Sequence, residues 1–168
     1  MRNVAFIGFM GAGKSYYSFK IGKKLHFAVM DTDQAIVRAQ GKTVAEIFAE
    51  QGEAHFRALE RELLLSLQKR RRLVLSLGGG TLLQEGNAEL IKPNFGVVLL
   101  DTPFETCLER VRRNTRRPLA VQSTDEQLYE MYCDRRQKYL ALADTVVRTD
   151  RAEEQVIAQI CAFMRKSR

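Results

Sequence analysis

The residues with the clearest chemical meaning lie near the start of the chain. Residues 8–15 read GFMGAGKS and fit the pattern G-x-x-x-x-G-K-[ST]. In such a loop the glycines let backbone N–H groups converge on phosphate oxygens, while Lys14 reaches the outer phosphates and the Ser15 hydroxyl can bind Mg²⁺. An apolar run at 4–7 precedes the loop and a helical pattern follows it, which is the context that this motif requires. A chance glycine-rich turn is the alternative.

Two carboxylates follow the next apolar run. Asp31 and Asp33 come directly after residues 27–30. Ligands of open α/β sheets bind at the carboxyl ends of the strands, so both side chains could reach a ligand there. One carboxylate could support Mg²⁺, and the other could accept the hydrogen bond or the proton of an attacking hydroxyl. The alternative is an aspartate that only caps the next helix.

Arginines and glycines further along suit a small anionic substrate. Arg57 and Glu60 are three residues apart, so they share a helix face and could pair, leaving Arg57 oriented to grip a carboxylate. The alternative is a surface ion pair of small consequence. The three glycines at 78–80 follow an apolar run, and they form either a plain loop or one whose N–H groups face a polar ligand. Arg135, four residues before Tyr139, is either a second carboxylate ligand or part of a packed helix surface.

A basic segment without apolar periodicity follows an arginine-rich helix end. It covers residues 114–122 and contains Arg116 and Arg117. Loops of this length in small domains are often lids over a site. We expect a lid at about 112–124, from which Arg117 could close on a phosphate during its transfer and stabilise its charge. A solvated basic loop is the alternative.

Five short apolar runs, alternating with helical patterns, must position these residues. They lie at 4–7, 27–30, 73–75, 97–100 and 145–147. Their shortness and β-branched content favour strands, and their continuous apolar character is typical of a parallel sheet buried on both faces. Helix starts are indicated by four pairs: Thr43 with Glu46, Thr102 with Glu105, Ser123 with Glu126, and Asp150 with Glu153. The alternation predicts one α/β domain over 1–168, with helices on both faces of the sheet.

Composition narrows the classes of partner. The chain has 168 residues, of which 45% are hydrophobic, and its net charge of +7 suggests an anionic partner. The basic run at 69–72 closes a helix and lacks the further basic and aromatic residues of a nucleic-acid surface, so we expect no nucleic acid. No stretch approaches the roughly 20 apolar residues of a spanning helix, so we expect no membrane partner. Three cysteines, Cys107, Cys133 and Cys161, fit neither a disulfide framework nor a metal site, which indicates free thiols in the cytoplasm.

Taken together, the motifs resemble those of shikimate kinases. The resemblance rests on GFMGAGKS at 8–15, DTD at 31–33, FRALE at 56–60, GGG at 78–80 and RPL at 117–119, in the order of the family. It implies the three-layer P-loop NTPase fold, with five parallel strands in the order 2-3-1-4-5. It also implies transfer of the ATP γ-phosphate to the 3-hydroxyl of shikimate, giving shikimate 3-phosphate for chorismate and aromatic amino-acid synthesis. The enzyme would be a cytoplasmic monomer that uses ATP and Mg²⁺, with shikimate and ATP as its partners.

The resemblance implies roles for individual residues. Lys14, Asp33 and Arg117 would be catalytic, and Ser15 and Asp31 would hold Mg²⁺. The nucleotide would be bound by Gly11, Ala12, Gly13, Lys14, Ser15, Tyr16, Arg110 and Arg117, with Arg110 against the adenine. Shikimate would be bound by Asp33 at its hydroxyls, by Arg57 and Arg135 at its carboxylate, and by Gly78, Gly79 and Gly80 along the pocket.

The sequence departs from the family pattern at Tyr16, where the family usually has threonine, whose hydroxyl can meet the α-phosphate. Two other functions stay open at this point. One is another small-molecule P-loop kinase, such as a nucleoside monophosphate kinase. The other is a nucleotide-binding homologue without catalysis.

Overall fold

A five-stranded parallel sheet forms the centre of the computed structural model, which describes residues 1–113 and 122–166. Its strands are β1 (Asn3–Ile7), β2 (Ala28–Asp31), β3 (Leu73–Ser76), β4 (Phe95–Asp101) and β5 (Thr145–Arg148). Their order in the sheet is β2-β3-β1-β4-β5, and all four neighbouring pairs are parallel. The predicted strands and their order are therefore confirmed.

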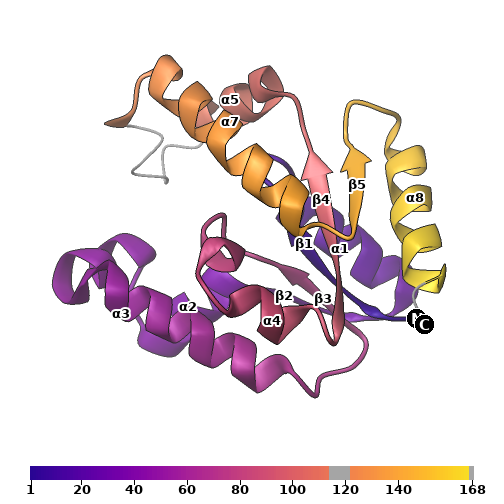
Figure 1. Cartoon of the computed structure of the whole chain (residues 1–168), viewed down its shortest axis with the longest axis horizontal. Helices are drawn as coiled ribbons and strands as arrows, with labels where there is room; N and C mark the ends of the chain where they lie inside the picture. Colours follow the sequence, from indigo (N-terminus) through magenta and orange to yellow (C-terminus); the bar gives the residue numbers. More distant parts are fainter. Residues whose placement is uncertain (114–121, 167–168) are drawn as a thin grey trace.

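Helices cover both faces of the sheet (Figure 1). They are α1 (Lys14–Leu25), α2 (Thr32–Gln40), α3 (Val44–Leu67), α4 (Asn87–Ile91), α5 (Phe104–Arg113), α7 (Asp125–Leu142) and α8 (Glu153–Lys166). A short 3₁₀ turn (Thr81–Leu83) follows β3. This arrangement gives the three layers that the alternation of elements predicts.

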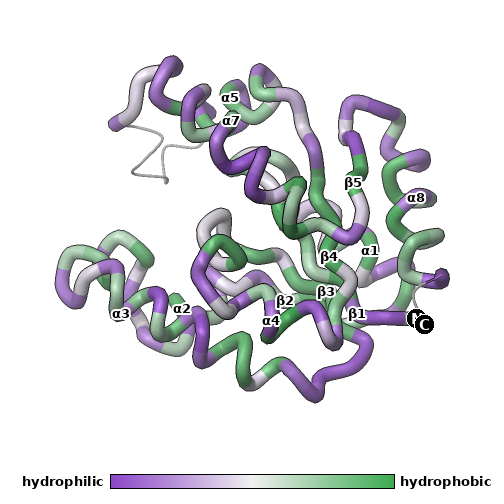
Figure 2. The backbone as a smooth tube through the Cα atoms, viewed as in Figure 1, coloured by the Kyte–Doolittle hydropathy of each residue, from purple (hydrophilic) through white to green (hydrophobic). Residues whose placement is uncertain are grey.

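Alternation of side chains along β1 explains why both faces are buried. Val4 and Phe6 point to a cluster that contains residues of α1, α5 and α8. Ala5 and Ile7 point to a second cluster, built with residues of α3 and α4. Successive side chains of a strand face opposite sides, so a continuous apolar run supplies two cores at once. Figure 2 shows hydrophobic residues concentrated along these central strands.

The start of α3 follows the predicted capping box. The side chain of Thr43 accepts a hydrogen bond from the backbone N–H of Glu46, and the Glu46 carboxylate accepts one from the backbone N–H of Thr43. The helix bends at Gly52, whose φ of 84° lies in the left-handed region. Past this bend, α3 carries Arg57 and Glu60 toward the carboxyl end of β3.

Three of the predicted helix starts are wrong in detail. The capping box of α7 is formed by Thr124 with Gln127, one residue later than expected. The sequence there offers two overlapping S/T-x-x-E/Q frames, and local pattern does not choose between them. Asp150 lies too early to cap α8, which begins at Glu153 after Ala152, and its carboxylate pairs with the Arg148 guanidinium. The hydroxyl of Thr102 bonds the Ala12 carbonyl and the Thr149 hydroxyl instead of the start of α5.

Two predictions about the whole chain can be compared with the described residues. The three cysteines are free thiols, as the sequence predicts, with Cys107 and Cys161 buried. None of the helices within 1–113 and 122–166 is both long and apolar enough to span a membrane. The predicted lid at about 112–124 falls largely on 114–121, which lie outside the described residues.

Candidate active site

The loop between β1 and α1 has the geometry of an anion site. Gly11 and Gly13 adopt left-handed backbone conformations, with φ of 80° and 92°. Gly13 is the N-cap of α1 and has no side chain, so nothing of its own covers the first N–H groups of the helix. Those N–H groups and the positive end of the helix dipole favour a bound phosphate. The Nζ of Lys14 donates to the carbonyls of Gly8 (2.7 Å) and Phe9 (3.1 Å), so the ammonium lies across the loop.

Helix α5 packs directly against the same loop. A Cβ at Gly11 would lie 2.7 Å from the carbonyl oxygen of Cys107, which leaves room only for glycine. Arg110, one turn further along α5, donates from Nη1 to the carbonyl oxygen of Gly11 at 3.0 Å. The loop is therefore held in shape by backbone packing and by one arginine that also lines the adjoining cavity.

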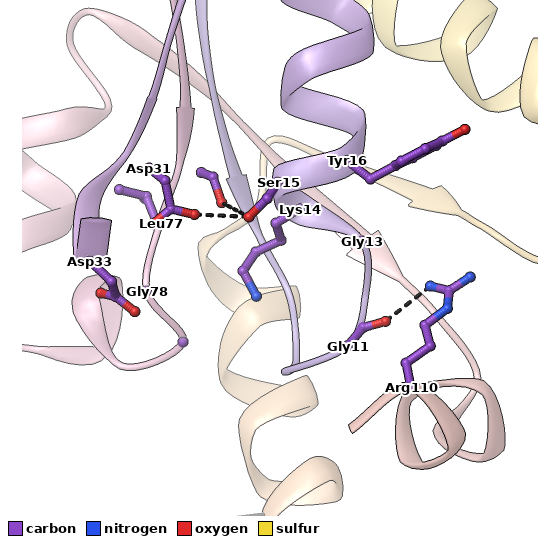
Figure 3. Close-up of a pocket in the computed structure, with 12 residues that line it drawn as sticks. Gly11, Gly13, Lys14, Ser15, Tyr16, Asp31, Asp33, Leu77, Gly78 and Arg110 are labelled. Carbon is purple, nitrogen blue, oxygen red and sulfur yellow. Dashed lines mark hydrogen bonds between the residues drawn. The ribbon is translucent and has the colours of Figure 1, made fainter. Parts of the chain in front are cut away.

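Three side-chain oxygens meet where β1, β2 and β3 end. The Ser15 hydroxyl donates to Oδ2 of Asp31 at 2.8 Å, and its oxygen lies 3.3 Å from Oγ of Ser76 (Figure 3). The other carboxylate oxygen of Asp31 accepts the N–H of Gln34 at 3.2 Å, so Asp31 also caps α2. The capping interpretation of Asp31 is therefore confirmed, and its other carboxylate oxygen lies beside Ser15. Oxygen donors of this kind suit Mg²⁺, which is held by few protein groups and completes its shell with water and phosphate.

On the other side of the site, a buried carboxylate fixes Arg57. The side chain of Glu60 is 1% exposed and accepts from Nη1 of Arg57 at 2.7 Å. Its second oxygen accepts the hydroxyl of Thr81 at 2.5 Å. Glu53 accepts from Nε and Nη2 of Arg57 at 3.2 and 3.0 Å. The predicted pair of Arg57 and Glu60 is confirmed, and it is not a solvated surface pair.

These contacts decide the charge of Arg57. Burial on its own would lower the pKa of Arg57, but the hydrogen bonds and charges of Glu60 and Glu53 raise it above its ordinary value. The guanidinium therefore stays charged around neutral pH and can attract an anion.

The three consecutive glycines each lie against a different polar side chain. A Cβ at Gly78 would lie 2.5 Å from Oδ1 of Asp33, and one at Gly79 would lie 3.0 Å from Nη1 of Arg135. A Cβ at Gly80 would lie 2.7 Å from Nη2 of Arg57. The loop thus gathers one carboxylate from α2, one guanidinium from α3 and one from α7. The sequence did not decide whether the glycine triplet is a plain loop or part of a ligand site. The charged side chains that lie against the triplet favour the ligand site.

Tyr139 joins the helix that carries Arg135 to the glycine triplet. Its hydroxyl donates to the carbonyl oxygen of Gly79 at 2.6 Å, and its side chain is buried. Burial raises the pKa of Tyr139, with Arg135 opposing the shift, so the phenol keeps its proton and remains a donor. The helix face shared by Arg135 and Tyr139 is therefore both packed and turned toward the site.

Two adjoining cavities connect these groups. One has a volume of about 380 Å³ and is lined by Asp33, Arg57, Arg135 and the glycine triplet. The other has a volume of about 230 Å³ and runs along the phosphate loop to Tyr16 and Arg110. Lys14, Ser15, Asp31 and Asp33 line both cavities. A phosphorylated ligand in the second cavity would therefore face an acceptor in the first.

Sequence reasoning missed several residues of this site. Met10, Phe48 and Phe56 line the larger cavity. They were missed because the sequence pattern does not distinguish apolar residues that line a cavity from those that fill the core. Ser76 joins the oxygen cluster, and its only signal is its place at the end of a predicted strand. Of the predicted site residues, Arg117 lies outside the described part of the chain.

A comparison with protein families decides the assignment. Residues 10–165 match the family model described as shikimate kinase. The chain belongs to the shikimate kinase family. A curated shikimate kinase from Persephonella marina is 36% identical over 98% of this chain and 100% of its own length. One from Limosilactobacillus fermentum is 38% identical over 97% of this chain and 95% of its own length.

Solved structures agree with the family and the fold. A shikimate kinase from Acinetobacter baumannii in complex with shikimate has a TM-score of 0.89 and 32% identity, covering 100% of this chain and 96% of its own. A deoxyadenosine kinase from M. mycoides with bound dCTP has a TM-score of 0.61 at 15% identity, covering 97% of this chain and 98% of its own, and shows a shared fold alone. The predicted family and P-loop kinase fold are both confirmed.

We expect the thiol beneath the phosphate loop to be chemically silent. Burial raises the pKa of Cys107 to about 11, and burial also raises that of Cys161. With a pKa above the working pH, about one thousandth of the Cys107 thiol is ionised at pH 8, so attack on a disulfide reagent is slow. Titration of the native protein with Ellman's reagent should therefore give one fast thiol, Cys133, and three after unfolding.

The variant Cys133→Ser serves as the control and should remove the fast phase. Fast reaction of two or more thiols in the native wild type would show that the packing around at least one of the buried thiols, Cys107 and Cys161, opens readily, which contradicts their burial.

Proposed function

We propose that this chain transfers the γ-phosphoryl group of ATP to the 3-hydroxyl of shikimate, at the place where the two cavities meet. Membership of the shikimate kinase family indicates the reaction, which is an ATP-dependent phosphorylation of shikimate. One observation carries the roles of the residues. The glycine triplet gathers Asp33, Arg57 and Arg135 around a cavity that joins the phosphate loop.

The acceptor is oriented by opposite charges at the two ends of its cavity. Shikimate has one carboxylate and three hydroxyls. Arg57 and Arg135 lie against Gly80 and Gly79, and together they would bind the carboxylate. Asp33 lies against Gly78 and lines both cavities, so it would accept hydrogen bonds from hydroxyls beside the phosphate loop. This orientation brings a hydroxyl, rather than the carboxylate, toward the phosphate to be transferred.

Positioning and charge stabilisation then account for the transfer. The loop N–H groups and Lys14 would bind the phosphates and offset the charge that develops on the transferred group. The oxygen of the 3-hydroxyl forms a bond to the γ-phosphorus, and the bond from this phosphorus to the β–γ bridging oxygen breaks, releasing ADP. Asp33 holds the attacking hydroxyl and would take its proton. Arg117 would reach the phosphates from the lid, as the resemblance implies.

Ser15 and Asp31 would hold Mg²⁺. Their oxygens and that of Ser76 form a cluster of hard donors beside the phosphate loop, which fits this ion. When bound, Mg²⁺ neutralises charge on the phosphates. Ser15 and Asp31, already hydrogen-bonded to each other, would fix its place relative to Lys14.

We further propose one domain over residues 1–168, acting as a monomer in the cytoplasm. The free cysteines support a reducing compartment. The composition of the site supports a monomer. Together, the two cavities are lined by described residues of α1, α2, α3, α5 and α7, all from one chain.

Release of ADP from MgATP tests the proposed function. We expect turnover with shikimate and background hydrolysis with matched concentrations of quinate, gluconate or AMP. Turnover with another acceptor and none with shikimate would preserve the phosphate chemistry and overturn the roles of Asp33, Arg57 and Arg135. Binding of ATP without turnover on any acceptor would favour a non-catalytic homologue.

The carboxylate role of Arg57 makes a specific kinetic prediction. Arg57→Ala should raise the KM for shikimate about tenfold or more, because a charged hydrogen bond to the substrate is lost. The KM for ATP should change by less than about twofold, since Arg57 does not line the nucleotide cavity. Steady-state kinetics with each substrate varied in turn measures both constants.

Arg61→Ala is the matched control. Arg61 lies one turn further along α3 and donates to Asn87, away from both cavities. It should leave both KM values near those of the wild type. Equal increases in the two KM values for Arg57→Ala would rule out the carboxylate role.

A further inference from the structure

The nucleotide cavity continues beyond the phosphate loop, on the side away from Asp33. Its lining there includes Tyr16 from α1 and Arg110 from α5. Figure 3 shows these two side chains on the same side of Gly13, while Asp33 and Gly78 lie on the other side of Lys14. With the γ-phosphate beside Asp33 and the phosphate chain along the loop, the nucleoside must leave the loop at the end that Tyr16 and Arg110 flank.

The ring of Tyr16 is exposed but held in place. Its relative exposure is 49%, yet its hydroxyl donates to the carboxylate of Glu153 at the start of α8. Lys20 bonds the same carboxylate at 3.1 Å, and its Nζ lies over the Tyr16 ring, 5.2 Å from the centroid. The ring of Tyr17 meets the ring of Tyr16 edge to face, with centroids 5.4 Å apart.

These contacts keep Glu153, which anchors the ring of Tyr16, charged at neutral pH. The hydrogen bond from Tyr16, followed by that from Lys20, lowers the pKa of Glu153. Its carboxylate is therefore a lasting acceptor for the phenol. An exposed aromatic ring that is anchored at its far end has little rotational freedom left to lose when a ligand binds. This small entropic cost favours affinity.

Arg110 presents a second planar group that is also held. Its Nη1 bonds the Gly11 carbonyl at 3.0 Å and would lie 3.6 Å from a Cβ at Gly13. Among the described residues this is the one hydrogen bond of the guanidinium, and its plane lies beside the cavity. Guanidinium planes and aromatic rings both stack on nucleobases.

We propose that Tyr16 is an affinity-determining residue for the nucleotide: its anchored ring packs against the nucleobase, with Arg110 as the facing wall. Recognition at this position is then by stacking, not by the hydroxyl contact with the α-phosphate that threonine would make. The inference rests on the proposed function only in that the cavity takes a nucleotide, and it is independent of the acceptor.

The proposal predicts how Tyr16→Val, which removes the ring without adding a hydroxyl, changes the binding of three probes. Stacking of a base on an aromatic side chain corresponds to about tenfold or more in affinity, so ADP should bind about tenfold more weakly. GDP should lose the same factor, because stacking uses the face of the base and not its edge groups. Tripolyphosphate has no nucleoside and should bind the variant as it binds the wild type.

Titration calorimetry with each probe and Mg²⁺, in the absence of any acceptor, measures these affinities. Tyr16→Phe keeps the ring and loses the bond to Glu153, so its loss of ADP affinity should be smaller, about twofold to threefold. Phe19→Val removes an aromatic ring of 61% exposure from the same helix outside the cavity and is the matched control, with unchanged affinities. Thermal unfolding of each variant checks that the fold is intact.

Three results would overturn the inference. Unchanged ADP affinity in Tyr16→Val would show that the ring does not touch the base. An equal loss of tripolyphosphate affinity would show that the substitution acts on the phosphate loop and not on the base. An equal loss of ADP affinity in Tyr16→Phe would show that the hydroxyl, and not the ring, is responsible. Because no acceptor is present, failure of these tests is distinguishable from failure to turn over shikimate.

Discussion

A carboxylate that is buried and must be paired holds the acceptor side of this site together. The Glu60 side chain is 1% exposed, so an uncompensated charge there would be expensive. It is satisfied by Arg57 on its own helix and by Thr81, which directly follows the glycine triplet. These two bonds connect α3 to the loop after β3. The distance between the guanidinium of Arg57 and the backbone of Gly80 is thereby fixed before any substrate arrives.

The phosphate side depends on backbone conformation instead. Gly11 and Gly13 take left-handed φ values, and the close approach of α5 to Gly11 excludes a side chain there. Asp31 links the two sides, because it binds Ser15 at the loop and caps the helix that carries Asp33. A kinase of this size can therefore hold a nucleotide and an acceptor with residues of five helices and the ends of three strands.

Much of this arrangement could be predicted from the sequence, and the reasons for success and failure are physical. The strands and the phosphate loop are local patterns, so their residues indicate them directly. The role of Arg135 was undecidable, because it depends on how α7 packs against Gly79, about sixty positions earlier in the chain. Ser76 and Thr81 were missed because ordinary hydroxyl residues acquire a role only through distant partners. The frame of the α7 cap was wrong because the residues at 123–127 permit two equivalent caps.

Glu60 positions Arg57 by means of its second bond, to Thr81, which lines neither cavity. A double-mutant cycle of Thr81→Val and Arg57→Ala on the KM for shikimate tests it most directly. Our account predicts that Thr81→Val raises this KM severalfold in the wild type, leaves the KM for ATP unchanged, and adds nothing when Arg57 is already alanine. An unchanged KM for shikimate, or the same increase in both backgrounds, would contradict it.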